Sequence, residues 1–238
     1  MAKAQASLGA AVAVFGFDAD PETPPSRALQ VLTVRRGLPR TDLDVRDTFE
    51  SAGGRAVEEA GGRLASARKG GRLTLVGVDD APTRNRRVTA WYYATAPLGE
   101  VGKPGAWTVA SRSTKLGGDD APAFRAAFER LRADTRHVTG AVALLGDVFT
   151  GDDLLRLHIA LHGGPEGSER TFRRRVQELR DTGVLRSVRE SEVAALRLRV
   201  SRFRSPAGTG GRPPELLRYS GSGGEDEQLA VLRARRTA

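Results

Sequence analysis

Residues 167–185 read GSERTFRRRVQELRDTGVL, and this stretch is the main indication of how the C-terminal part of the chain folds. Phe172, Val176 and Leu179 recur at the spacing of an amphipathic helix that packs one stripe against a core. The rest of the helix is dense in guanidinium groups, which suits contact with a polyanion such as nucleic acid. Four arginines lie in its first turns: Arg170, Arg173, Arg174 and Arg175.

The residues before this stretch predict a second helix. Thr150 suits its N-cap, and Asp152 and Asp153 suit the positive end of its dipole. Gly163 is expected to end that helix, and Gly183 is expected to end the arginine-rich one. Two helices joined by a short turn are typical of a helix-turn-helix domain.

The segment after the arginine-rich helix predicts a wing. Residues 186–200 are expected to begin it, residues 205–214 to form a flexible turn, and residues 215–219 to return as a strand. Arg212 lies in the turn, from which its side chain would reach the minor groove or the backbone of DNA. The C-terminal part is therefore expected to be a winged helix-turn-helix domain.

The N-terminal part interleaves strands and helices, which predicts an α/β or α+β domain. Residues 1–10 are expected to form a loose tail. One helix is expected over residues 44–64, interrupted by Gly53 and Gly54, and another over residues 124–132. Strands are expected over residues 11–17, 28–34, 73–78 and 88–94, with a short one at 107–110.

Composition favours an anionic partner. The formal net charge is +9 and the sequence pI is about 10.8. Arginine, alanine and glycine are also abundant in proteins of GC-rich genomes, so the local clustering of arginine carries more weight than the total charge. The chain has no cysteine, which excludes disulfides, thiolate metal sites and a cysteine nucleophile and fits a cytoplasmic protein. No apolar run approaches the roughly 18 residues of a membrane span.

Three stretches resemble the Nudix-related transcriptional regulators, a family best known for repressing NAD-synthesis genes. Two of them resemble the strand and the sequence box of a Nudix domain: LTVRR with the following Leu38 and Pro39, and DTFESAGGRAVEEAGG at residues 47–62. The third is the most specific, because several motifs similar to the family's winged helix recur in order: LLGDVFTGDDLLRLHIAL, RTFRRRVQELRDTGVL and GRPPELLRY.

This resemblance implies an α+β chain with two domains. It implies a degenerate Nudix-like α/β/α sandwich over residues 8–138, a winged helix-turn-helix domain over residues 139–222 and a tail over residues 223–238. It also implies a repressor that binds a double-stranded DNA operator as a homodimer, with half-sites about one helical turn apart. The old substrate cleft would hold an effector, ADP-ribose or a related nucleotide or sugar phosphate, that shifts the two recognition helices. No cofactor and no membrane partner are expected.

The box-like stretch lacks carboxylates that a Nudix hydrolase needs. The hydrolase chemistry requires several glutamates on one helix face to hold Mg²⁺ against a diphosphate. Ala56 and Ala60 stand at two of the three key positions, and of the remaining Glu58 and Glu59 one lies off the metal-binding face. We therefore expect a protein that is not an enzyme. The other positions of the pattern fall on Thr41, Asp47, Arg55, Val57, Glu59 and Gly62.

Residues that are expected to bind a ligand or DNA lie in both expected domains. Arg36, Arg55 and Glu59 are the expected effector contacts. Arg170 and Thr171, at the start of the arginine-rich helix, are expected to approach bases or phosphates. Successive helical residues turn by about 100°, so only two of the three arginines at positions 173–175 are expected to reach the duplex.

Other interpretations stay open at this point. The basic cluster is also compatible with a solvated helix face on which Glu169 and Glu178 pair with arginines. The chain as a whole is also compatible with a Nudix hydrolase that has atypical metal ligands and a nucleic-acid-binding C-terminal domain, or with a module whose Nudix-like part only dimerises. His158 and His162 have the spacing of a zinc pair, but Ile159 stands where a metalloprotease has glutamate, which favours packing.

Overall fold

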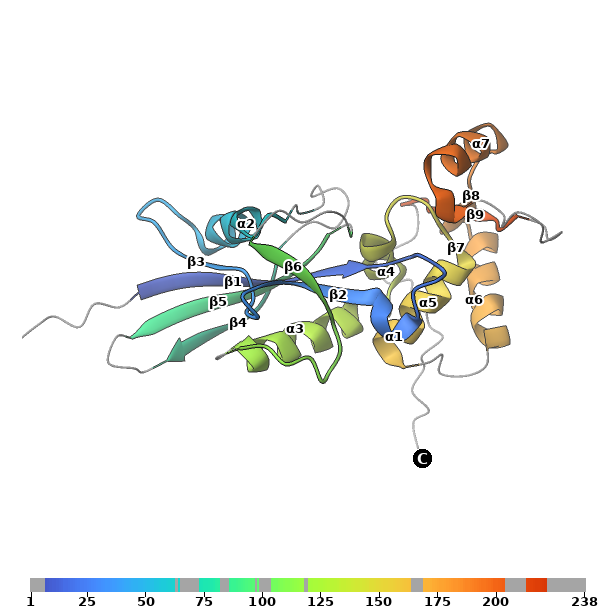
Figure 1. Cartoon of the computed structure of the whole chain (residues 1–238). Coiled ribbons are helices and arrows are strands. Elements are labelled where there is room, and N and C mark those ends of the chain that lie inside the picture. Colours follow the sequence, from blue (N-terminus) through green and yellow to red (C-terminus); the bar gives the residue numbers. More distant parts are fainter. Residues whose placement is uncertain are drawn as a thin grey trace, which may run out of the picture. The chain divides into compact units, whose positions relative to one another are not determined.

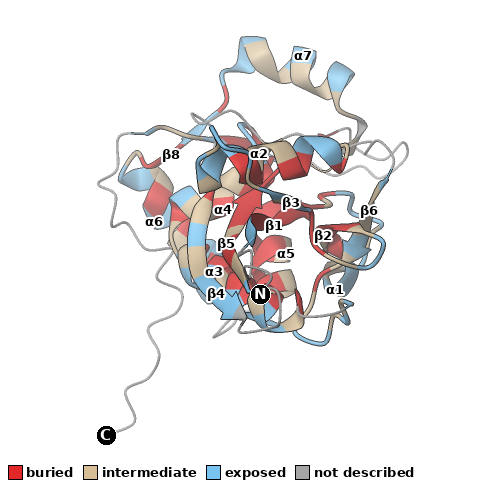
Figure 2. Cartoon of the chain, turned by 90° about the vertical axis from the view of Figure 1, so that its left-hand side faces the viewer, coloured by how far each residue is buried: buried red, intermediate tan, exposed pale blue. Residues whose placement is uncertain are grey.

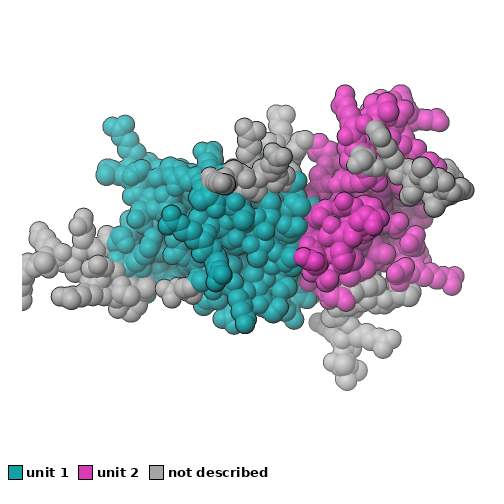
Figure 3. Space-filling view, viewed as in Figure 1, with its two compact units in different colours: residues 1–17, 29–132 teal, residues 18–28, 133–238 magenta. Residues whose placement is uncertain are grey.

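The chain is described from a computed structural model (Figure 1). It describes residues 7–62, 64, 73–81, 86–96, 98, 104–117, 120–163, 169–203 and 213–221. The chain divides into two compact units, which Figure 3 colours separately: unit 1 is residues 1–17 and 29–132, and unit 2 is residues 18–28 and 133–238. The expected domain boundary after residue 138 stays a prediction, and the expected tail lies outside the described residues.

Unit 1 is built on a six-stranded sheet with the order β4-β5-β1-β2-β6, in which β3 also pairs with β1. The central strand β1 (Ser7–Phe17) runs parallel to β5 (Arg87–Thr95) and antiparallel to β2 (Leu29–Val34) and β3 (Arg40–Asp42). The edge strands β4 (Thr74–Ala81) and β6 (Gly105–Val109) are each antiparallel to their neighbour. Nearly all of β1 is buried, as expected of a strand that is covered on both faces.

One helix covers each face of this sheet. Helix α2 (Phe49–Glu59) packs on the face that carries Val12 and Val14. Side chains alternate along a strand, so Phe15 points to the opposite face, which α3 (Asp120–Asp134) covers. There Phe124 and Phe128 lie with ring centroids 5.9 and 6.3 Å from that of Phe15. The three layers confirm the expected α/β/α sandwich (Figure 1).

The glycines of α2 do not interrupt it, contrary to the sequence prediction. The helix is shorter than the expected segment 44–64 and begins after Thr48, whose side chain closes a capping box. Gly53 lies where the helix meets the sheet: a Cβ there would come within 2.9 Å of Leu73 Cδ1 and 3.3 Å of Val12 Cγ2. Glycine at this position therefore allows the helix to approach the sheet closely.

Two strands also differ from the prediction. Residues 7–10, expected in a loose tail, belong to β1, because the ladder with β5 starts at the pair Ser7 and Arg87. Strand β3 is absent from the sequence prediction, since three residues are too few to show an alternating pattern. Its position is fixed by pairing with β1, a contact distant in sequence.

Unit 2 combines helices with a small sheet. Its helices are α1 (Pro25–Ala28), α4 (Val138–Leu145), α5 (Gly151–His162), α6 (Glu169–Asp181) and α7 (Glu190–Arg199). The antiparallel sheet has the order β7-β9-β8, with strands β7 (Phe149–Thr150), β8 (Leu185–Ser187) and β9 (Leu216–Tyr219). Helices α5 and α6 followed by β8 and β9 form the expected winged helix-turn-helix.

The ends of α5 form as the sequence predicts. The Thr150 hydroxyl accepts the Asp153 N–H at 3.0 Å, and the Asp153 carboxylate accepts the Thr150 N–H at 2.8 Å. Gly163 at the other end has a φ of 80°, which glycine adopts without strain. These local signals explain why the helix was predictable from sequence.

The segment expected to begin the wing is mostly helical, which corrects the prediction for residues 186–200. Only β8 is extended there, and α7 and a short 3₁₀ turn (Ser201–Phe203) follow it. Acidic residues in the first turn of α7 and arginines in its last turn suit the helix dipole. Figure 2 shows that α7 carries no buried residue, although Val193 and Leu196 are half-buried against the small core beneath it.

Candidate nucleic-acid interface and ligand cavity

Helix α6 buries one side and exposes the other. Phe172, Val176 and Leu179 are buried, as the stripe predicts. Five residues of the first half are exposed: Glu169, Arg170, Thr171, Arg173 and Arg174. Three of them, Arg170, Arg173 and Arg174, share one face at the spacing i, i+3, i+4, and we call them the α6 arginine face.

The arginines of α6 differ in their ion pairs and in their exposure. Arg173 Nη2 lies 3.2 Å from Asp152 Oδ1, and both side chains are about two-thirds exposed. Arg174 Nε lies 3.6 Å from Glu178 Oε1. Exposed pairs of this kind contribute at most about 1 kcal/mol, so a phosphate can replace either carboxylate. Arg175 is less exposed, at 29%, and donates to Glu178 at 2.9 Å.

The expected wing contact lies outside the described residues. Arg212 belongs to residues 204–212, which the structure does not describe, so its role stays a prediction. The described root of the wing, β8 and β9, carries further arginines at positions 186 and 218, which the sequence reasoning did not single out.

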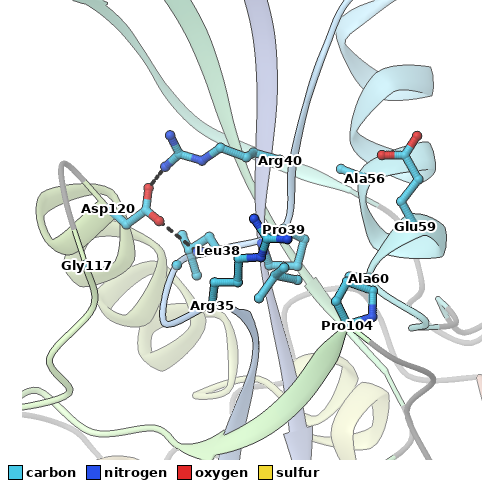
Figure 4. A pocket seen from close by; sticks show the side chains of 12 residues that line it. Arg35, Leu38, Pro39, Arg40, Ala56, Glu59, Ala60, Pro104, Gly117 and Asp120 are labelled. Carbon is cyan, nitrogen blue, oxygen red and sulfur yellow. Dashed lines mark hydrogen bonds and ion pairs between the residues drawn. The ribbon is translucent and has the colours of Figure 1, made fainter.

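Unit 1 contains a cavity of about 670 Å³ (Figure 4). Known ligand pockets have volumes of about 300–1,000 Å³. The connection between β2 and β3, helix α2 and the start of α3 contribute to its walls. Its lining residues are Val34, Arg35, Gly37, Leu38, Pro39, Arg40, Ala56, Glu59, Ala60, Pro104, Gly117 and Asp120.

A buried carboxylate organises one wall of the cavity. Asp120 is 1% exposed, and its Oδ2 accepts the Leu38 N–H at 2.7 Å, while the Arg40 guanidinium pairs with its Oδ1 (Figure 4). Asp120 begins α3, where the helix dipole favours a negative charge. A Cβ on Gly37 would come within 2.8 Å of Asp120 Oδ2, so glycine is needed there. The carboxylate thereby ties the loop after β2 to α3.

The turn before this loop has an unusual backbone. Val34 and Gly37 exchange two main-chain hydrogen bonds of 2.8 and 2.9 Å around Arg35 and Arg36. The φ angles of Arg35 and Arg36 are 51° and 70°. Two-residue hairpin turns favour positive φ at both central positions, where arginine is uncommon and strained. Arg35, the first central residue of this turn, lines the cavity.

The expected effector residues take three different positions. Glu59 lines the cavity, whereas Arg36 and Arg55 are not among its lining residues. The Arg36 carbonyl accepts the Gly117 N–H at 2.8 Å. The Arg55 guanidinium pairs with Asp47, lies 3.7 Å from Glu59 Oε1 and also approaches Asp44. Hydrogen bonding to Asp47 raises the pKa of Arg55 further, and a hydrogen bond from the Asp44 N–H lowers the pKa of Asp47.

The lining does not fit a magnesium site. Ala56 and Ala60, whose methyl groups cannot bind a metal, line the cavity with Glu59 (Figure 4). The other carboxylate in the wall, Asp120, is already engaged with Arg40 and the Leu38 N–H. Mg²⁺ requires an octahedral set of oxygens, and one exposed glutamate does not provide it.

The two histidines of α5 pack against α6. His158 is buried, with its ring centroid 4.6 Å from that of His162 and 5.6 Å from that of Phe172. Burial, with a smaller contribution from Arg136, lowers the pKa of His158 to about 4. Its imidazole is therefore neutral at pH 7 and acts as part of the interface between α5 and α6. Among the described residues, no cluster of three histidine, aspartate or glutamate ligands surrounds the pair.

The sandwich of unit 1 and the helix pair and sheet of unit 2 define the class of fold as a Nudix-like domain with a winged helix. The chain has the fold of NrtR from Shewanella oneidensis, whose crystal structure covers 89% of this chain and 93% of its own at a TM-score of 0.61 and 20% identity. The structure of the same protein complexed with a 27mer DNA gives a TM-score of 0.63 at 20% identity, over 89% and 93% of the two chains.

A third structure has the same fold at lower identity. A MutT/nudix family protein from Enterococcus faecalis is similar at a TM-score of 0.58 and 15% identity, over 90% of this chain and 88% of its own. No protein-family model matches the sequence, and no curated protein matches it. At these identities the solved structures establish the fold.

Sequence reasoning missed part of the cavity wall. Arg35, Arg40 and Asp120 line it. Arg35 lies in the LTVRR stretch but was not expected to bind a ligand, and Arg40 and Asp120 stood in no recognisable motif. Asp120 lies 80 residues beyond Arg40, so only the folded chain brings them together. The sequence did provide a signal at Leu38 and Pro39, which follow the strand in the first Nudix-like stretch.

Proposed function

We propose that the chain is a sequence-specific DNA-binding transcriptional regulator whose Nudix-like unit binds a small anionic effector without hydrolysing it. The α6 arginine face carries this proposal. It is exposed on the second helix of a helix-turn-helix, the element that enters the major groove in DNA-binding domains of this kind. The fold shared with Shewanella oneidensis NrtR, which binds a 27mer DNA in one structure, supports the same function.

The proposed contacts on α6 follow from exposure. Arg170 and Thr171 stand at the start of the helix, where side chains reach base edges. Arg173 and Arg174 exchange their carboxylate partners for phosphates. Arg175 is the least exposed of the three, and its 2.9 Å pairing with Glu178 supports the helix. Arg212 is proposed to contact DNA from the wing.

The proposed effector is ADP-ribose or a related nucleotide or sugar phosphate. The cavity has the volume of a small-molecule site, and the guanidinium groups of Arg35 and Arg40 suit an anion. Glu59, which lines the cavity, remains a proposed contact, as do Arg36 and Arg55, which are not among its lining residues. Because Ala56 and Ala60 replace two metal-binding carboxylates, the bound ligand stays intact. The regulator is proposed to act as a homodimeric repressor.

The DNA-binding proposal is tested by removing two of the three arginines of the α6 arginine face. Duplexes enriched from a random library by the wild-type chain provide the probe, and fluorescence anisotropy at several salt concentrations gives affinity and salt slope. The variant Arg173→Ala/Arg174→Ala is expected to bind about tenfold or more weakly, and its slope should fall by about 0.9 for each phosphate that the chain no longer neutralises.

A matched control separates direct binding from total charge. Arg46 and Arg125 are exposed in unit 1, and Arg46→Ala/Arg125→Ala removes the same two charges. This control should keep affinity within about twofold of wild type, because the charges it removes lie outside unit 2. Equal behaviour of the two double variants would refute the assignment of α6 as the recognition helix.

A further inference from the structure

The root of the wing contains a second concave site, which we call the wing-root cavity. It has a volume of about 420 Å³ and lies wholly within unit 2, between β8, β9 and the first turn of α7. Its charged and hydroxyl-bearing walls include Arg186, Ser187, Arg189, Glu192, Arg218 and Ser220. The three arginines come from three different elements or their flanks, so the fold gathers them from separate parts of the sequence.

Two of these arginines are direct neighbours across the strands. Arg186 of β8 and Arg218 of β9 form a pair in the antiparallel ladder, so their side chains stand on the same face. Like charges directly opposite each other destabilise a sheet. Both residues are exposed rather than packed, so burial of apolar surface does not explain their pairing. An anion between them would remove the repulsion.

The cavity holds more positive than negative charge. Glu192 of α7 lies 3.2 Å from Arg218 Nη2 and neutralises that arginine. Arg186 and Arg189 are exposed and form no ion pair with any described residue. Three guanidinium groups and one carboxylate leave two positive charges on one concave surface. Guanidinium groups bind phosphate through paired N–H···O bonds, which makes phosphate the anion that this surface fits.

The cavity is linked to the end of α6. Glu215, just before β9, accepts from Arg180 of α6 at 2.8 Å and from the Ser187 hydroxyl, and Ser187 lines the cavity. The cavity and the α6 arginine face belong to the same compact unit, so a duplex bound by this unit supplies phosphate groups to both. This shared unit favours a DNA phosphate over a free metabolite as the ligand.

We propose that the wing-root cavity binds a phosphate group of the DNA backbone through Arg186, Arg189 and Arg218, with Glu192 limiting the affinity. This inference rests on the proposed DNA-binding function and adds a contact that is separate from the recognition helix. Backbone contacts of this kind fix the position of a domain on the duplex and strengthen binding to every sequence alike.

The test uses two variants with opposite expected effects. Arg186→Ala/Arg189→Ala in the full chain should weaken duplex binding by about tenfold and lower the salt slope by about 0.9, the value for one phosphate contact. Glu192→Gln removes the carboxylate and should strengthen binding by about threefold. Enriched and scrambled duplexes should respond equally, because the contact reads no base. Arg46→Ala/Arg125→Ala remains the control for the removal of positive charge.

The outcomes distinguish this inference from the proposed function. If Arg173→Ala/Arg174→Ala weakens binding while Arg186→Ala/Arg189→Ala and Glu192→Gln both match the control, the cavity proposal is overturned and the recognition helix stands. If the wild-type chain binds no duplex, the proposed function itself fails. Thermal unfolding of each variant shows whether a weaker affinity reflects an unfolded chain.

A second probe identifies the source of the phosphate. Inorganic pyrophosphate, titrated calorimetrically into the wild-type chain, should bind weakly and compete with the duplex. Arg186→Ala/Arg189→Ala should abolish that competition. Pyrophosphate binding that disappears in this variant while duplex binding stays unchanged would assign the cavity to a free phosphorylated ligand and overturn its assignment to DNA.

Discussion

Single side chains set the chemistry of both sites. In unit 1, Asp120 accepts the Leu38 N–H and pairs with Arg40, so its charge supports the cavity wall and is not available to a metal. Without such partners, burial raises the pKa of a carboxyl group and favours its protonated, neutral form. In the same wall, Ala56 and Ala60 present methyl groups, which cannot serve as metal ligands. This chemistry supports the proposal that the cavity holds an anion without hydrolysing it.

His158 gives unit 2 a specific acid sensitivity. Burial, with Arg136 nearby, lowers its folded-state pKa to about 4, whereas an unfolded histidine titrates near 6.5. Between these values the unfolded chain binds the proton and the folded chain does not, so stability falls as the pH falls. The full contribution is present above about pH 6.5, and roughly 3 kcal/mol of it should be lost by about pH 4.

This prediction is checked by urea unfolding at pH 7 and at about pH 4.5. His158→Phe keeps an aromatic ring beside Phe172 and should remove most of the difference that is specific to this residue. Phe172→Leu changes the ring packed against His158 and keeps the imidazole, so it should retain a fall in stability toward low pH. An unchanged pH dependence in His158→Phe would contradict the assignment of the effect to the buried imidazole.

At the scale of elements, helices with local signals were the predictable ones. The capping box of α5 and the apolar stripe of α6 act within a few residues, so sequence alone located both helices. Helix α7 was missed, since only Val193 and Leu196 of its apolar residues pack against the core while Leu198 is exposed, which leaves its helical periodicity faint. Strand β3 was missed because its position in the sheet depends on pairing with β1, a segment distant in sequence.

The candidate sites were likewise predictable where their residues share a local sequence pattern, and not where distant segments meet. The α6 arginine face was predictable, because its residues share one helix and its apolar stripe identifies the buried side. The ligand cavity was predictable only in part: α2 contributes Ala56, Glu59 and Ala60 as expected from the Nudix-like stretch. Its other walls come from a strained two-residue turn and from the start of α3, which no local pattern relates to each other.

Arg156 of α5 holds a segment that belongs to the β1–β2 connection. Its guanidinium donates to the carbonyls of Pro21, at 2.9 Å, and of Asp20 and Thr23. Arg156→Ala should therefore release residues 18–28 and lower the free energy of unfolding of unit 2 by about 2 kcal/mol, since each of these hydrogen bonds contributes about 1 kcal/mol or less. Arg156→Lys should restore only part of this, because lysine lacks the planar fork.

Hydrogen exchange and urea unfolding together check this prediction. Amides of residues 18–28, including the Asp18 N–H that donates to the Ala28 carbonyl, should exchange faster in Arg156→Ala. Arg199→Ala removes an exposed arginine from the same unit and should leave exchange in this segment unchanged. Wild-type exchange in Arg156→Ala would show that the three carbonyl contacts do not hold the segment.

At the scale of the whole molecule, chain continuity connects the cavity of unit 1 to unit 2, for which we propose DNA binding. Strand β2 follows directly after residues 18–28, which belong to unit 2. The same strand ends at the strained turn of Arg35 and Arg36, beside the cavity of unit 1. A ligand that changes the turn therefore has a route through one strand to the segment that Arg156 holds. Coupling by such a route requires that the ligand prefer one of two states.

ADP-ribose provides the test of this coupling. It should raise the melting temperature of the wild-type chain and change duplex affinity by about 5- to 100-fold, the usual range of allosteric coupling. Saturating duplex should change ADP-ribose affinity by the same factor and in the same direction, because coupling free energies are reciprocal. Arg35→Ala, at the cavity wall, should weaken ADP-ribose binding and leave ligand-free duplex affinity unchanged.

The same samples decide between a sensor and a hydrolase. With Mg²⁺ present, ADP-ribose should be recovered intact after hours of incubation, because the wall of the cavity presents methyl groups at positions 56 and 60 where a metal site needs oxygens. Mg²⁺-dependent release of AMP would instead establish the hydrolase. A melting temperature that neither ADP-ribose nor related nucleotides change would indicate that unit 1 does not sense, and that the arginines of unit 2 act without an effector.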